Sequence, residues 1–270
     1  MTLEGLDISI LGPACVAGLL VLSTHVPLGQ QVLSRGIIFI DLAIAQVAAL
    51  GVILAQYFGV DEQGYGVQIA AAVAALFGAG LLTMTDKRWP QYQEPLIGTM
   101  FVLAATGSLL LLANNPHGGE HLKDLLVGQI LWVSLGQLVP AALFSAVILA
   151  VLWFRRGTLT GLWFYGLFAL AITASVQLVG VYLVFASLIV PALATAGMRG
   201  PQRLISAYAI GAVGYASGLA LSAMLDLPSG AMIVWTLAGC GILAQFVPAV
   251  RHSHPAQHGA SAHASAAATR

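Results

Sequence analysis

Long runs of apolar residues, separated by short polar segments, occupy most of the chain up to about residue 250. Each run approaches the roughly 20 residues that an α-helix needs to cross the hydrocarbon of a bilayer. A helix also satisfies its backbone hydrogen bonds internally, which is required where no water is available. The pattern therefore predicts nine membrane-spanning helices, at residues 8–28, 36–58, 66–85, 95–114, 129–154, 160–178, 180–197, 204–224 and 229–250.

The number of spans depends on one short break. Only Val179-Gly180 separates the sixth run from the seventh, so one long helix with a broken element, giving eight spans, is an equally good interpretation. In both cases the predicted fold class is an all-α polytopic membrane protein, with a transmembrane domain over residues 1–250. Residues 251–270 consist mainly of Ala, Ser and His without apolar periodicity, which predicts a disordered tail.

The composition excludes several classes of protein. Hydrophobic residues make up 59% of the chain and charged residues only 7%, whereas soluble domains carry about 25% charged residues. Ten basic residues balance ten acidic ones, which leaves no excess positive charge to hold nucleic acid. Cys15 and Cys240 each lie in an apolar run without a ligand partner at metal-binding spacing, so we expect neither a disulfide framework nor a zinc finger.

Charge is distributed unequally between the two sides of the predicted spans. Basic residues follow the odd-numbered spans, at Arg35, Lys87, Arg88, Arg155, Arg156, Arg199, Arg203 and Arg251. Acidic residues dominate the other side, at Glu4, Asp7, Asp61, Glu62, Glu120, Asp124 and Asp226. Short loops rich in Lys and Arg stay in the cytoplasm. We therefore expect the C-terminus and the tail inside the cell and, with nine spans, the N-terminus outside.

Asp41 is the one acidic residue within a predicted span. An unpaired carboxylate in lipid costs about 2.5–3.5 kcal/mol even on the mild insertion scale, so Asp41 must face the bundle interior or a wet path. Gln46 lies five residues further along the same helix. Both are candidates for a translocation path. The alternatives are a capping or helix–helix contact for Asp41 and an interhelical hydrogen bond for Gln46.

The loop at residues 114–121 gathers His117, Glu120 and His121 on the predicted outer side. Imidazole and carboxylate groups are ligands for Zn²⁺ and related ions, so this loop is a candidate for attracting metal. The three residues also match the H-x-x-E-H pattern of a zinc peptidase. Gly118 and Gly119 favour a turn over the helix which that enzyme needs, so the peptidase is the weaker alternative.

The tail carries further imidazole groups that can chelate a metal ion, at His252, His254, His258 and His263. No phosphate-binding loop of the form G-x-x-x-x-G-K-[ST] occurs in the sequence. If the protein uses ATP, another subunit must therefore hydrolyse it. The Pro- and Gly-rich segment 190–203 forms a predicted cytoplasmic turn, where such a subunit could act.

Five segments, in order along the chain, together resemble the integral-membrane permeases of the ATP-binding-cassette (ABC) importers for zinc and manganese. The five segments are residues 35–51, residues 94–100 with Glu94-Pro-Leu-Ile-Gly, residues 125–131, residues 179–196 with Pro191-Ala192, and Asp226-Leu-Pro-Ser-Gly230. The resemblance covers nearly the whole chain up to residue 250. It implies a bundle like that of type II ABC importers.

The resemblance also implies partners and roles. Two permease copies, or a paired permease, would enclose one path in the cytoplasmic (inner) membrane of a bacterium, with an extracytoplasmic metal-binding protein outside and two ATPase subunits inside. No resident cofactor is implied beyond the transported metal and the partner's ATP. Residues implied in coupling to the ATPase are Ala194, Thr195, Gly197, Arg199, Gly200 and Arg203, and those implied in structural motifs are Gly51, Pro191, Asp226, Pro228 and Gly230.

One departure from the family concerns the path. Its members commonly carry an acidic residue and, four positions later on the second helix, a histidine. Alignment on Gly51 places Leu42 and Gln46 at these positions, with Asp41 displaced by one. The leading hypothesis is a non-enzymatic permease for a divalent metal ion, zinc first and manganese or iron(II) next. The alternatives are a permease for a metal chelate such as a siderophore or cobalamin, the peptidase, and a membrane scaffold or sensor that uses the His-rich tail.

Overall fold

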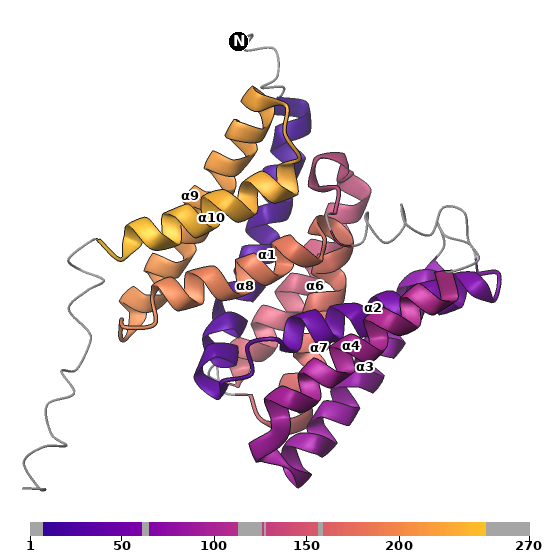
Figure 1. Ribbon diagram of the computed structural model, residues 1–270. Coiled ribbons are helices and arrows are strands. Elements are labelled where there is room, and N and C mark those ends of the chain that lie inside the picture. Colours follow the sequence, from indigo (N-terminus) through magenta and orange to yellow (C-terminus); the bar gives the residue numbers. More distant parts are fainter. Residues whose placement is uncertain (1–7, 61–64, 113–125, 127, 156–158, 247–270) are drawn as a thin grey trace, which may run out of the picture.

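The computed structural model describes residues 8–60, 65–112, 126, 128–155 and 159–246, and these form helices joined by short turns (Figure 1). It contains no strand in these residues, which confirms the predicted all-α fold. The helices are α1 (Ile8–Arg35), α2 (Ile40–Tyr57), α3 (Tyr65–Arg88), η2 (Pro90–Tyr92), α4 (Gln93–Leu112), η3 (Ile130–Trp132), α6 (Leu135–Phe154), α7 (Gly161–Val179), α8 (Val181–Ala194), α9 (Pro201–Leu225) and α10 (Ser229–Ala244).

Seven of these helices are long and apolar enough to cross a membrane. The other two long apolar segments form shorter helices than predicted, with 14 residues in α8 and 16 in α10. The predicted span at 180–197 ends early because the chain turns after Ala194, where Thr195 takes a non-helical backbone conformation. The predicted span at 229–250 ends at Ala244, and residues 247–250 lie outside the described part.

Gly180 divides the sixth run from the seventh. Its φ of 81° lies in the left-handed region, which favours glycine and interrupts an α-helix. The two runs are therefore not one continuous helix, since α7 ends at Val179 and α8 begins at Val181. Both interpretations include this break, so the choice between eight and nine spans stays a prediction. The span predicted at 129–154 is present but begins later, at Leu135, because extended backbone at Val133 and Ser134 separates η3 from α6.

The bundle has two groups of helices on either side of α1 (Figure 1). One group packs α2 against α3 and α4, with α7 beside α3, and the other packs α10 against α9 and α8. Glycines allow close approach in both groups. A Cβ on Gly51 would overlap Ala74 of α3, and one on Gly218 would overlap Ile233 of α10. Small residues at helix contacts are expected where lipid gives no hydrophobic drive to association.

Proline in α1 creates a link to α9. Pro27 has no backbone N–H, so the carbonyl of Ser23, four residues earlier, loses its helical donor. The hydroxyl of Tyr208 donates to this Ser23 oxygen at 2.8 Å. At the end of α1, the guanidinium of Arg35 donates to the Leu159 carbonyl and lies 3.9 Å from the ring centroid of Phe164.

Candidate functional site

Asp41 lies in the first turn of α2 and is buried, with 1% of its surface exposed. Neither of its carboxylate oxygens has a hydrogen-bond partner among the described residues. Apolar neighbours along the chain, Ile40 and Ile44, are also fully buried. The position at a helix N-terminus is favourable to negative charge, because the backbone N–H groups there give the helix a positive end. The prediction that Asp41 faces the bundle interior is confirmed.

Gln46 is also buried, with 4% of its surface exposed. Five residues separate it from Asp41, which corresponds to about 140° around the helix axis and about 7.5 Å along it. The two side chains therefore leave α2 in different directions. Both residues lie inside the bundle, and the helix geometry does not bring them to one point.

A second carboxylate lies at the beginning of α2, and sequence analysis did not place it in a site. Glu94, in the first turn of α4, accepts a 3.4 Å hydrogen bond through Oε1 from the backbone N–H of Phe39. Its Oε2 atom is buried without a partner in the described residues. Phe39 in turn stacks on Phe185 of α8, with ring centroids 6.4 Å apart. The start of α2 is thus fixed by groups from α4 and α8.

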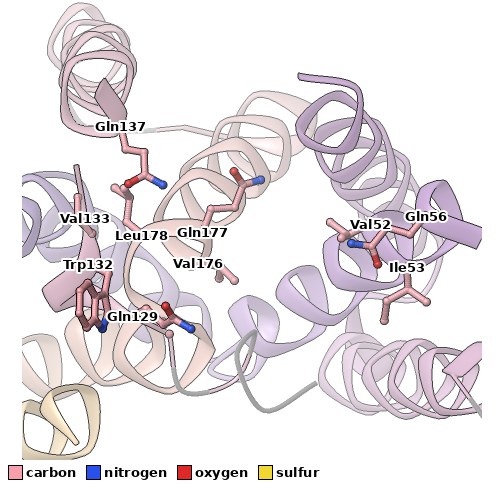
Figure 2. A pocket seen from close by; sticks show the side chains of 11 residues that line it. Val52, Ile53, Gln56, Gln129, Trp132, Val133, Gln137, Val176, Gln177 and Leu178 are labelled. Carbon is pink, nitrogen blue, oxygen red and sulfur yellow. The ribbon is translucent and has the colours of Figure 1, made fainter. Parts of the chain in front are cut away.

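A cavity of about 290 Å³ lies at the other end of α2. Figure 2 shows Gln56 reaching into it from α2, while Gln129, Gln137 and Gln177 lie on the opposite side. The cavity is lined by Val52, Ile53, Gln56, Gly128, Gln129, Trp132, Val133, Gln137, Val176, Gln177 and Leu178. Four amides thus converge here from α2, the segment before η3, α6 and α7, and sequence analysis named none of them as site residues.

Gly128, which lines this cavity, makes a close contact between two of the family-like segments. Gly128 has a φ of +69°, and a Cβ there would overlap the backbone of Val179 and Gly180. Segments 125–131 and 179–196 therefore meet at a point that only glycine fits. Next to it, the backbone N–H and the hydroxyl of Ser134 both donate to Oε1 of Gln137, at 2.9 and 3.2 Å, which caps α6.

The segment implied in coupling, residues 194–203, forms the turn between α8 and α9. Ala194 and Thr195 are buried, whereas Arg199 and Gly200 are exposed. The amide of Gln245, just after α10, donates to the carbonyl of Ala194 at 2.9 Å and holds the end of α8. Gly197 and Arg203 are partly buried, so only part of the implied set is available to a partner.

The other motif residues have structural positions. Asp226 ends α9 with a left-handed φ of 51°, and Pro228 stands at the N-terminal boundary of α10. Gly230 and Pro191 are buried within α10 and α8. These positions fit roles in turns and packing.

Several predicted metal ligands lie outside the described residues: His117, Glu120, His121, His252, His254, His258 and His263. They stay predictions. Within the described part, no group of three His, Cys, Asp or Glu side chains could hold a metal ion. His25 is also buried there; its Nε2 has no partner among the described residues, and its Nδ1 lies 2.9 Å from the Val21 carbonyl oxygen. In the sequence, its position within the first apolar run was the feature that indicated burial.

The seven long apolar helices of the described part are those of a multi-pass membrane protein. The chain belongs to the ABC 3 transport family, whose sequence model matches residues 7–164 and 158–247. The resemblance to ABC permeases is thereby confirmed. The chain is a multi-pass transport permease and not itself an enzyme.

Individual relatives agree with this assignment. The chain is 26% identical to a probable iron transport system membrane protein of Haemophilus influenzae over 267 residues, which cover 90% of this chain and 95% of that one. It is also 26% identical to an uncharacterized membrane protein of Synechocystis over 253 residues, covering 86% and 88%. In fold it resembles PsaBC from Streptococcus pneumoniae, solved in complex with Fab, with a TM-score of 0.75, 22% identity and coverage of 93% and 98%.

Proposed function

We propose that this chain is the permease subunit of an ABC importer for a divalent metal ion. Two copies enclose the path, an extracytoplasmic binding protein delivers the ion, and two ATPase subunits drive transport from the cytoplasmic side of the inner membrane. The observation that carries the proposal is the buried, unpartnered carboxylate of Asp41 in a chain of the ABC 3 transport family.

The energetics of Asp41 support a role on the path. Ionisable residues inside a membrane are costly and typically mark the route of an ion. A bound cation offsets the free-energy cost of burying the Asp41 carboxylate. Because part of the attraction is used in this way, the net affinity is low enough for the ion to leave again. No other side chain pairs with the Asp41 oxygens among the described residues, so the N-terminal end of α2 stabilises the charge and leaves the oxygens able to meet a cation.

The donor atoms favour some ions over others. Asp41 and the amide side chains offer oxygen, and carboxylate, carbonyl and water ligands suit manganese better than zinc. The relative from Haemophilus influenzae is described as an iron transport protein. We therefore place manganese(II) and iron(II) beside zinc, the ion that the resemblance favours most, and the choice among the three stays a prediction.

The orientation rests on charge. Arg35 lies at the end of α1, Lys87 and Arg88 at the end of α3, and Arg155 directly after α6. By the positive-inside rule these ends face the cytoplasm. Arg199, in the turn after α8, belongs to the same side, which supports docking of the ATPase there. The cavity at the C-terminal ends of α2 and α7 then opens to the outside.

The second candidate function is import of a metal chelate. It is favoured by a fold likeness to a transporter assigned to the metal-chelate type of ABC transporter, seen in an inward-facing conformation. The TM-score is 0.62 with 17% identity, and 87% of this chain and 85% of that one are covered. The missing histidine at position 46 also leaves a path poor in strong ligands.

The test is metal uptake in cells that lack this chain. Growth under metal limitation and uptake of radioactive zinc, manganese and iron(II) are compared without the chain and with it restored. The proposal predicts that restoration raises the uptake of one free ion. If uptake of no free ion changes but uptake of a chelate does, the second candidate replaces it.

A further inference from the structure

We propose that the cavity at the outer end of α2 binds a divalent cation that still carries its inner shell of water, through hydrogen bonds to the side-chain oxygens of Gln56, Gln129 and Gln177. This inference rests on the proposed function, because it assumes that the chain carries a metal ion. It adds a binding site, remote from Asp41, and the chemical form in which the ion enters.

The amides are free to accept hydrogen bonds. No hydrogen bond within the described part of the chain engages the side chains of Gln56, Gln129 or Gln177. Metal-bound water is a strong donor, and an amide oxygen is a neutral acceptor with two lone pairs. Gln137 differs, since its oxygen already accepts two hydrogen bonds from Ser134 and caps α6, so it offers no free acceptor to the water of the ion.

The lining lacks the groups that would strip water from the ion. Among the described residues it contains no carboxylate, imidazole or thiol, which are the side chains that bind metals directly. Neutral amides give weaker and reversible binding. That suits a site at which the ion pauses before it moves on.

The size of the cavity fits a hydrated ion. Six water molecules at about 30 Å³ each occupy about 180 Å³, which leaves room within the cavity volume of about 290 Å³. Val52, Ile53, Val133, Val176 and Leu178 give the cavity apolar walls, whereas Gln129, Gln137 and Gln177 are exposed and reachable by a hydrated ion.

The cavity and Asp41 lie at opposite ends of one helix. Gln56 is 15 residues beyond Asp41, which places them about 22 Å apart along the axis of α2. The ion therefore meets neutral amides first and a carboxylate later. Loss of coordinated water belongs between these two points.

The experiment uses cobalt(III) hexaammine, which does not exchange its ligands and presents N–H donors in place of coordinated water. Metal uptake by cells carrying the full transporter is measured against increasing concentrations of this ion. The test variant combines Gln56→Leu, Gln129→Leu and Gln177→Leu and keeps Gln137 for the α6 cap. The control is Gln68→Leu, because Gln68 is exposed on α3 and does not line the cavity.

We expect cobalt(III) hexaammine to inhibit uptake by the wild type and by Gln68→Leu at the same concentration. The triple variant should require at least a tenfold higher concentration for the same inhibition. Uptake by the triple variant should also show a KM about tenfold higher. A single Gln177→Glu variant keeps a polar side chain of the same length and adds a negative charge. It should therefore bind the trivalent ion more tightly, and its uptake should be inhibited at a lower concentration of that ion. The amount of each variant in the membrane is measured alongside.

Two results would overturn the inference while leaving the proposed function intact: metal uptake that the ion does not inhibit, or inhibition that is equal in the wild type, the triple variant and Gln177→Glu. Failure of the proposed function is distinct from both, because the wild type would then support no uptake of a free ion at all.

Discussion

Substitution of Gly128 by alanine tests whether the contact between two distant segments builds the cavity. Gly128 has a left-handed φ of +69°, and an alanine Cβ there would overlap backbone atoms of Val179 and Gly180. Backbone atoms cannot rotate away as a side-chain end can, so the segment before η3 must move. Gln129, next in the chain, would move with it.

The magnitude follows from two separable costs. The left-handed backbone costs alanine about 1–2 kcal/mol. Overpacking adds about 1–3 kcal/mol, so the free energy of unfolding of Gly128→Ala should fall by about 2–5 kcal/mol. Gly59 provides a matched control, because its φ is +82° and a Cβ there would meet no atom within 4 Å among the described residues. Gly59→Ala should carry the first cost alone.

The assay compares unfolding of the purified variants by denaturant in detergent, together with metal uptake in cells at equal amounts in the membrane. Gly128→Ala should lose both stability and uptake, and Gly59→Ala should keep most of its uptake. Equal losses of stability in the two variants would show that the contact at Val179 and Gly180 contributes nothing. The explanation of the cavity wall would then be refuted.

Two further predictions concern single hydrogen bonds between helices. Tyr208→Phe leaves the carbonyl of Ser23 unpaired and should lower the free energy of unfolding by about 0.6–1.7 kcal/mol. Pro27→Ala restores a helical donor to this carbonyl, so a double-mutant cycle should show a smaller loss for Tyr208→Phe in that background. An unchanged loss would refute the explanation. Gln245→Leu removes the hydrogen-bond donor to the Ala194 carbonyl, a bond that contributes about 1 kcal/mol to stability. Amide hydrogen exchange in the turn after α8 should therefore become about fivefold faster. Unchanged exchange would show that this bond does not hold the turn.

Hydropathy predicted the helices well, because an apolar run in a membrane must satisfy its backbone hydrogen bonds internally, as a helix does. It could not predict that α8 and α10 are short, since the length of an apolar run does not reveal where a turn such as that at Thr195 begins. The break after η3 was equally hidden, because Val133 and Ser134 do not interrupt the apolar pattern.

The site was predicted in part. A carboxylate within an apolar run must be buried or wet, and Asp41 is buried as expected. The cavity was missed because its four glutamines come from segments far apart in sequence, and no local pattern brings Gln56 near Gln177. The available signal was an amide near the end of three apolar runs, at Gln56, Gln129 and Gln177, which gains meaning only when the helices are packed together.

Uptake of the preferred metal ion by an Asp41→Asn variant tests the central claim most directly. Asparagine keeps the shape of the side chain and removes the charge that a passing cation needs. Asp226→Asn is the control, because Asp226 is an exposed carboxylate in the turn before α10. The account predicts that Asp41→Asn loses most of its uptake while remaining folded, and that Asp226→Asn transports like the wild type. Full uptake by Asp41→Asn, at the same amount in the membrane, would contradict the claim that the ion passes this carboxylate.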